Sequence, residues 1–172
     1  LESTFREQMA ILADEGIDFF LLETFTHVQE ARLAAKTASE FGLPIFVSVT
    51  VGRDGETRSG EKIELLIREL DADEHVDGLS INCGIGPAAA FSIAERALPL
   101  TTKPLVVLPN AGVPQEVDGR MIYMSTPEYF TEYAKSMTQI GVRGVGGCCG
   151  TTPEHIAMMA KSVHTLTGVK KH

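Results

Sequence analysis

Apolar and polar positions follow one another along the chain in a repeating block. Each block has a polar stretch with apolar residues at helical spacing, then a glycine or proline, then a short apolar run rich in β-branched residues. This pattern predicts helices and strands in alternation, with one long irregular loop over residues 110–125. The helices are expected over 3–15, 27–41, 61–70, 87–98, 126–140 and 152–166, and the strands over 17–23, 44–51, 77–82, 104–108 and 142–147.

Continuous apolar strands that alternate with helices indicate a parallel sheet covered by those helices. Two architectures fit the pattern: an open doubly wound sheet, or a (β/α)₈ TIM barrel of which five units are present. In both, functional groups lie where a strand runs into the next helix. Glu23, the pair Asn82 and Cys83, Asn110 and the segment 146–151 all fall at such positions.

Composition and charge indicate a globular protein and argue against nucleic-acid binding. A chain of 172 residues with 44% hydrophobic and 22% charged residues is typical of one globular domain. The net charge of −8, with Lys170 and Lys171 as the only basic cluster, argues against nucleic-acid binding. Neither a membrane-spanning run nor a signal peptide is found, so we expect a cytoplasmic protein. Because Leu1 is not a start methionine, we expect the chain to begin inside a longer gene product.

The three cysteines carry the strongest chemical signal. Cys83 follows the strand 77–82, and Cys148 and Cys149 follow the strand 142–147, so all three are expected on one rim of the sheet. An odd count does not suit a disulfide framework. Three thiolates can bind Zn²⁺ and leave the fourth tetrahedral position open, as in catalytic zinc sites. A lone buried cysteine is usually a small core residue, and an adjacent pair can be a reactive pair, so the zinc interpretation depends on the joint placement.

Three segments resemble a known family. SINCGIGP, LPNAGVP and VGGCCGTTPEHI, in this order and spacing, resemble the homocysteine S-methyltransferase family, and most closely the homocysteine-binding domain of the cobalamin-dependent methionine synthase type. The resemblance implies a (β/α)₈ TIM barrel in which this chain supplies strands four to eight. Residues 1–172 would then be a partial homocysteine-binding barrel domain without its N-terminal units. It also implies that Cys83, Cys148 and Cys149 bind zinc.

The resemblance assigns roles to residues around the zinc as well. It implies that Glu23 binds the α-ammonium group of the substrate and that Asn110 is a displaceable fourth zinc ligand. From the residues alone, Glu23 is equally a solvated or helix-capping carboxylate, and Asn110 a cap of its turn. Glu23, Asn110 and Asn82 are the candidate substrate-binding residues, and Asn82 is expected chiefly to orient the loop beside Cys83 through backbone hydrogen bonds. His155 is expected at the surface rather than at the metal.

The resulting hypothesis is zinc-dependent methyl transfer to the thiol of homocysteine, giving methionine. A free thiol is mostly protonated at neutral pH, and binding of its sulfur to zinc removes the proton. The methyl donor stays open among methylcobalamin, S-methylmethionine and betaine. PNAG followed by GGCCGTTPEHI favours methylcobalamin carried on a separate domain or protein.

The resemblance is incomplete at the N-terminal side. The family carries there an Asp-Gly-Ala-Met-Gly-Thr-like loop that resembles a holder of the substrate carboxylate, and this chain has no matching segment. Five units cannot close an eight-stranded barrel, so association that covers the open edges is expected. Two alternatives remain: an inactive zinc- or thiol-binding fragment that needs an N-terminal partner segment, and a methyltransferase for another small thiol or selenol. We expect the chain alone to lack methyltransferase activity.

Overall fold

A five-stranded parallel sheet forms the centre of the protein, in the order β1-β2-β3-β4-β7. The computed structural model describes residues 1–168, so Lys170 and Lys171 lie outside the described residues. A separate antiparallel hairpin pairs β5 with β6. The strands are β1 (Phe20–Phe25), β2 (Ile45–Val49), β3 (Gly78–Asn82), β4 (Leu105–Leu108), β5 (Gln115–Val117), β6 (Arg120–Ile122) and β7 (Gly144–Val145).

A helix follows each strand of the main sheet, and one further helix precedes the first strand. Within residues 1–168, none of the helices has the length and apolar character needed to cross a membrane. The helices are α1 (Glu2–Asp14), α2 (Val28–Ala38), α3 (Ile63–Asp71), α4 (Pro87–Ala97), α5 (Pro127–Ile140) and α6 (Pro153–Thr167), with short 3₁₀ turns η1 (Ser39–Phe41) and η2 (Leu98–Leu100).

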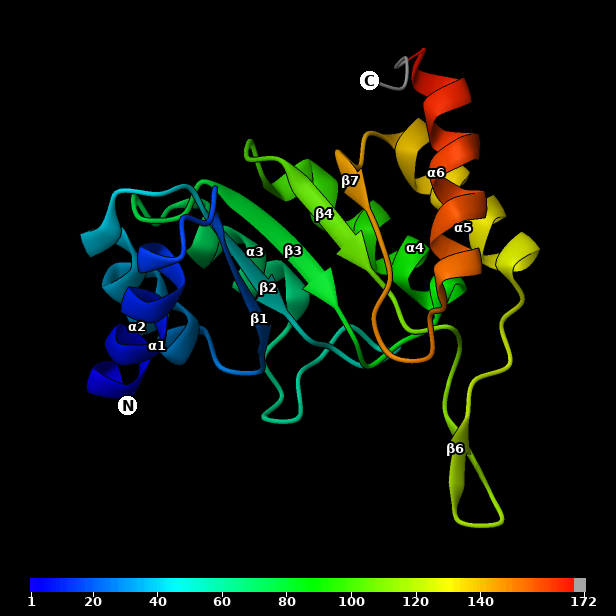
Figure 1. Ribbon diagram of the computed structural model, residues 1–172, viewed down its shortest axis with the longest axis horizontal. Coiled ribbons are helices and arrows are strands. Elements are labelled where there is room, and N and C mark those ends of the chain that lie inside the picture. Colours follow the sequence, from blue (N-terminus) through cyan, green and yellow to red (C-terminus); the bar gives the residue numbers. More distant parts are fainter. Residues whose placement is uncertain (169–172) are drawn as a thin grey trace.

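The strand order decides between the two predicted architectures. In a doubly wound sheet the order reverses at a switch point, whereas here every neighbour in the sheet is the next main-sheet strand in sequence. Right-handed crossovers then place the connecting helices on one face, as in the wall of a barrel. Figure 1 shows α1 and α2 at one end of the sheet, α5 and α6 at the other, and the β5–β6 hairpin projecting from the body. The doubly wound alternative is therefore excluded.

Local sequence explains where α2 packs and where α5 begins. The alanines along one side of α2, Ala31, Ala34, Ala35 and Ala38, are fully buried. Thr126 caps α5, because its hydroxyl accepts the Tyr129 N–H at 3.3 Å. The first helix begins at Glu2, one residue before the expected start, with Leu1 in the cap position and no side-chain cap.

The inner face of the sheet, which faces away from the helices, alternates large and small side chains. Phe46 on β2 lies beside Gly78 on β3, where a Cβ atom would overlap the Phe46 ring. At the other end, a Cβ at Gly146 would lie 2.6 Å from Leu108 Cδ2. This large-beside-small arrangement lets neighbouring strands curve toward each other, as interior positions of small barrels require.

Three predicted elements differ from the structure. The strand expected over 17–23 is shifted to Phe20–Phe25, and the one expected over 142–147 is reduced to Gly144–Val145. The segment 110–125 is not irregular throughout, because it contains the β5–β6 hairpin. Asp118 and Gly119 at its tip have φ values of 50° and 72°, as a type I′ turn requires. The Asp-Gly pair was the overlooked signal for this hairpin.

Candidate metal centre

Cys83 sits in a sharp turn directly after β3. Both Cys83 and Gly84 have left-handed backbone conformations, with φ values of 58° and 68°. For a non-glycine residue this conformation is uncommon and strained, and such strain persists where the surroundings enforce it. Here the Cys83 N–H donates to Leu108 O at 3.1 Å and the Ile85 N–H donates to Cys83 O at 2.7 Å. The turn thus directs the chain across the end of the sheet.

Cys148 and Cys149 lie in the loop after β7, which is bound along its length to the loop after β4. The Cys148 N–H donates to Pro109 O at 2.9 Å, and Cys149 O accepts the Ala111 N–H at 2.9 Å. The side chain of Asn110 adds a third link, because its Oδ1 accepts the Cys149 N–H at 3.1 Å. Backbone contacts to residues 109–111 therefore fix the position of both thiols.

The three sulfur atoms converge on one point of the rim. The Cys83 and Cys149 sulfurs are 3.8 Å apart, and those of Cys148 and Cys149 are 3.9 Å apart. All three lie within 4.8 Å of one another. Sulfurs bound to a tetrahedral zinc ion at about 2.3 Å are separated by about 3.8 Å. The donor set and its spacing thus fit a zinc ion with one position left for another ligand.

Electrostatics oppose simultaneous ionisation of Cys83 and Cys148 in the absence of a cation. Burial raises the pKa of Cys83, but hydrogen bonds from the Gly84 N–H and from Cys149, Cys148 and Asn110 outweigh it, so that pKa lies below its ordinary value. Burial and the charge on Cys83 raise the pKa of Cys148 to about 12. A bound divalent cation would reverse this balance, because metal-bound thiols lose their protons.

Asn82, at the end of β3, connects three strands beneath the turn. The side chain is 1% exposed. Its Oδ1 accepts from Ser48 Oγ at 2.7 Å and from the Thr24 N–H at 3.1 Å, and its Nδ2 donates to Thr24 Oγ1 at 2.8 Å. Thr24 itself has a φ of 71°, which is unusual for a β-branched residue. Thr24 and Ser48 thus occupy the amide of Asn82, which ties the end of β3 to β1 and β2.

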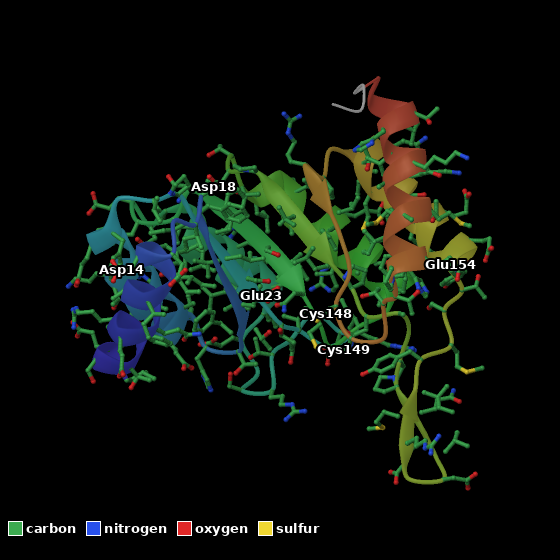
Figure 2. The ribbon with its side chains drawn as sticks, viewed as in Figure 1. Asp14, Asp18, Glu23, Cys148, Cys149 and Glu154 are labelled. Carbon is green, nitrogen blue, oxygen red and sulfur yellow. The ribbon has the colours of Figure 1, made fainter. Side chains whose placement is uncertain are left out.

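Glu23 and Asn110 occupy different positions relative to the three cysteines. Glu23 is exposed and lies inside β1 rather than at its end, just before the irregular pairing that Thr24 introduces. Figure 2 shows it on β1, toward the same end of the sheet as Cys148 and Cys149. Asn110 is 4% exposed and contacts the cysteine loop directly. Asn110 is therefore part of the thiol cluster, whereas Glu23 stands on the strand farthest from β7.

His155 and Tyr123, which lie next to the cysteine loop in sequence or in packing, occupy positions that the sequence did not predict. His155 is 6% exposed, so its expected surface position is wrong. Its Nδ1 contacts the Thr152 N–H at 3.2 Å, and its Nε2 contacts Ser125 O at 2.9 Å. Tyr123 packs over Gly150, where a Cβ atom would overlap its ring. A Thr-x-x-His sequence at a helix start resembles a capping box and was a usable signal for His155, whereas local sequence held no signal for Tyr123.

Fold and site together define a parallel α/β protein with a three-thiol cluster at the carboxyl ends of its strands. A family model described as homocysteine S-methyltransferase matches residues 1–163. The chain therefore belongs to the homocysteine S-methyltransferase family.

Two curated relatives represent different members of this family. The S-methylmethionine–homocysteine S-methyltransferase of Rattus norvegicus is 26% identical over 180 residues, covering 95% of this chain and 49% of the relative. The methionine synthase of Mycobacterium leprae is 30% identical over 170 residues, covering 95% of this chain and 14% of that protein. The chain thus spans about half the length of the rat relative.

Solved structures of another protein have the same fold as this chain. The apo form of the homocysteine methyltransferase MmuM from Escherichia coli superposes with a TM-score of 0.74 at 24% identity, covering 94% of this chain and 57% of that one. Its metallated form gives a TM-score of 0.73 at 23% identity, covering 94% and 52%. The arrangement of strands and helices is therefore the one found in that enzyme.

Proposed function

We propose that this chain is part of a homocysteine-binding (β/α)₈ barrel that transfers a methyl group to the thiol of homocysteine, giving methionine. In this proposal residues 1–172 supply strands four to eight, and Cys83, Cys148 and Cys149 hold Zn²⁺. The observation that carries the proposal is the convergence of the three sulfurs within 4.8 Å on the rim where such barrels place their active sites. Family membership supports the choice of substrate.

The chemistry that zinc supplies when bound is deprotonation of the substrate thiol, which turns it into a nucleophile at neutral pH. In this proposal, residues of the chain bind the ion and orient the substrate for this step. The three cysteines bind the ion, and Asn110 lies close enough to the cluster to act as the fourth ligand that substrate displaces. Asn82 holds the turn that presents Cys83. The exposed carboxylate of Glu23 is the proposed partner of the α-ammonium group of homocysteine.

For the methyl donor we propose methylcobalamin, carried on a separate domain or protein. The similarity to the Mycobacterium leprae methionine synthase at 30% identity supports this choice over S-methylmethionine, which the name of the rat relative specifies at 26% identity. The exposed position of the cysteine loop, in which Cys149 is accessible, suits a donor that approaches from outside the barrel.

The test is zinc stoichiometry of the purified chain, measured with and without homocysteine. We expect about one zinc per chain, coordinated by three sulfurs that become four when homocysteine binds, as read by X-ray absorption. The triple Cys83, Cys148 and Cys149→Ser variant should bind no zinc at comparable affinity. A Ser80→Cys variant, which adds a thiol away from the rim, is the control and should not raise the stoichiometry.

A folded wild-type chain that binds no zinc would contradict the proposal and would favour the interpretation as an inactive thiol-containing fragment. A second outcome is that homocysteine leaves the number of zinc ligands unchanged while another small thiol or a selenol raises it. That result would make the other thiol or the selenol the methyl acceptor.

A further inference from the structure

An extra residue in β1 interrupts the regular pairing of that strand with β2 at Glu23. Two residues of β1, Glu23 and Thr24, lie opposite a single residue of β2. The register pairs on either side are Leu22–Val47 and Phe25–Val49. This is the pattern of a β-bulge, and bulges re-aim side chains next to functional sites. Glu23 and Thr24 are both exposed, whereas a regular strand points successive side chains to opposite faces. The conformation of the bulge therefore decides where the Glu23 carboxylate points.

The side chain of Asn82 stabilises this bulge. Thr24 has a φ of 71°, a left-handed conformation that is strained in a β-branched residue and persists where its surroundings enforce it. Its N–H donates to Asn82 Oδ1 at 3.1 Å, and its Oγ1 accepts from Asn82 Nδ2 at 2.8 Å. Asn82 is 1% exposed and also accepts from Ser48 Oγ at 2.7 Å. The amide cannot turn away without leaving buried polar groups unpaired, so it holds Thr24 in the bulged conformation.

The contact between Asn82 and Thr24 links two parts of the proposed site. Asn82 is the residue before Cys83, and Thr24 is the residue after Glu23. Their two hydrogen bonds reach across β2, which lies between β1 and β3 in the sheet. Figure 2 shows Glu23 on β1 toward the end of the sheet where the cysteine loop lies. The separation between the carboxylate and the thiol cluster therefore depends on this contact.

This separation matters for the choice of thiol, in an inference that rests on the proposed function. A short carbon chain joins the sulfur of homocysteine to its ammonium group. A site that binds both groups at once needs a metal and a carboxylate at a matching separation. If the strand that carries Glu23 were free to move, binding would also have to order that strand, and the ammonium group would add less affinity. A site that hydrogen-bonds a substrate group with fixed partners discriminates against the analogue that lacks this group.

We propose that Asn82, by holding the bulge at Thr24, fixes the Glu23 carboxylate relative to the metal ligands and so makes the site selective for thiols that carry an ammonium group. Asn82 is a positioning residue in this role, because its buried amide is bonded to protein groups and acts on the substrate only through Glu23. Thr24 transmits the constraint through its backbone N–H and its hydroxyl.

The test measures the affinity of the zinc-loaded chain for homocysteine and for γ-mercaptobutyrate, which lacks only the amino group, by isothermal titration calorimetry. The ratio of the two dissociation constants cancels effects common to both thiols, such as a less stable fold. We expect the wild type to prefer homocysteine about tenfold, the factor that one hydrogen bond between charged groups represents. Asn82→Ala should lose most of this preference. Thr24→Val, at an exposed position, should lose it as well, whereas Thr24→Ser keeps the hydroxyl and should retain it.

A double-variant cycle tests the route through Glu23. Glu23→Gln should lose the preference by itself, and adding Thr24→Val should change it no further. A wild-type preference in both Asn82→Ala and Thr24→Val would overturn the positioning role, as would a further change in the double variant. A zinc-loaded wild type that binds the two thiols equally would overturn the ammonium-binding role of Glu23 and this inference with it. A wild type that binds no zinc would overturn the proposed function itself.

Discussion

At the scale of single residues, the buried side chain of Asn82, the residue before Cys83, joins β3 to β1 and β2. Its buried amide satisfies a Thr24 N–H that the left-handed conformation of Thr24 directs away from the sheet ladder. Ser48 donates to the same oxygen. A buried donor that loses its acceptor costs the full desolvation of that donor. Asn82 thus stabilises the left-handed conformation of Thr24 in β1 and links the ends of three strands.

We therefore expect Asn82→Ala to lower the free energy of unfolding by about 2–3 kcal/mol and to weaken zinc binding. The measurement is urea denaturation, followed by zinc competition with a chromophoric chelator. Ser80→Ala is the control on the same strand, because Ser80 Oγ is buried without a partner among residues 1–168 and its loss should cost less than about 1 kcal/mol. Equal losses of stability in the two variants would contradict the role given to Asn82.

The sequence predicted that Cys83, Cys148 and Cys149 lie on one rim, because the carboxyl ends of parallel strands lie at the same edge of a sheet. Asn110 was predicted on that rim for the same reason. The same rule does not predict the positions of Tyr123 and His155, since Tyr123 lies in the segment that returns from the hairpin to Gly150 and His155 is buried at the start of α6. Neither contact has a periodic signature in the chain.

At the scale of elements, loops at the amino ends of the strands are also fixed by side chains. Asp71, the last residue of α3, accepts from Thr101 Oγ1 at 2.6 Å and from the Thr102 N–H at 2.9 Å, just before β4. Burial raises the pKa of Asp71, but these hydrogen bonds together with one from Lys103 outweigh it, so the pKa lies below the ordinary value. The carboxylate thus orders the entry into the strand that separates the two cysteine segments.

Asp71→Asn should therefore cost about 1 kcal/mol of unfolding free energy at neutral pH. Because the folded-state pKa is depressed, this contribution is present above the unfolded value of about 3.9 and is lost as pH falls through the folded value. The check is urea denaturation of both proteins from neutral to acid pH, in which their difference should disappear. Asp14→Asn, at the exposed end of α1, should show no such pH-dependent difference. A difference for Asp71→Asn that persists in acid would refute the assignment.

Element types were predictable, and element ends were not. The predominantly apolar segment 17–23 marks a strand but does not show where pairing begins, because both faces of a buried parallel strand are apolar. The structure starts it at Phe20. The last strand was predicted too long, at 142–147, because only Gly144 and Val145 pair with β4. Glycine is a weak strand former, and Gly144 and Gly146 lie against the Val106 and Leu108 side chains.

At the scale of the whole molecule, the sheet has two apolar edges. A groove of about 420 Å³ runs along β1 and is lined by Phe5, Phe19 and Leu21 among others. A second groove, of about 620 Å³, runs beside β7 and is lined by Val142, Ile156 and Met159 among others. Exposed strand edges and apolar patches promote association.

We expect the 172-residue chain, studied alone, to self-associate at micromolar concentration, as read by sedimentation velocity. The double variant Leu21→Lys and Ile156→Glu places a charge at each edge and should shift the chain toward monomer. Leu65→Lys, on the outer surface of α3, should leave association unchanged. A wild-type chain that stays monomeric at such concentrations would contradict this prediction, because the exposed edges would then not drive association.

The position of β4 between β3 and β7 has a consequence for the order in which the protein assembles. Cys83 and Cys149 are separated by 66 residues, and their sulfurs meet only when β4 has paired on both sides. The unfolded chain offers a cation no more than the adjacent Cys148–Cys149 pair. A metal that uses all three sulfurs therefore selects chains in which this pairing is complete and stabilises them by mass action. Under the proposed function, we therefore expect metal to bind only after β3, β4 and β7 have paired, and we expect removal of the metal to destabilise the carboxyl-terminal part of the sheet first.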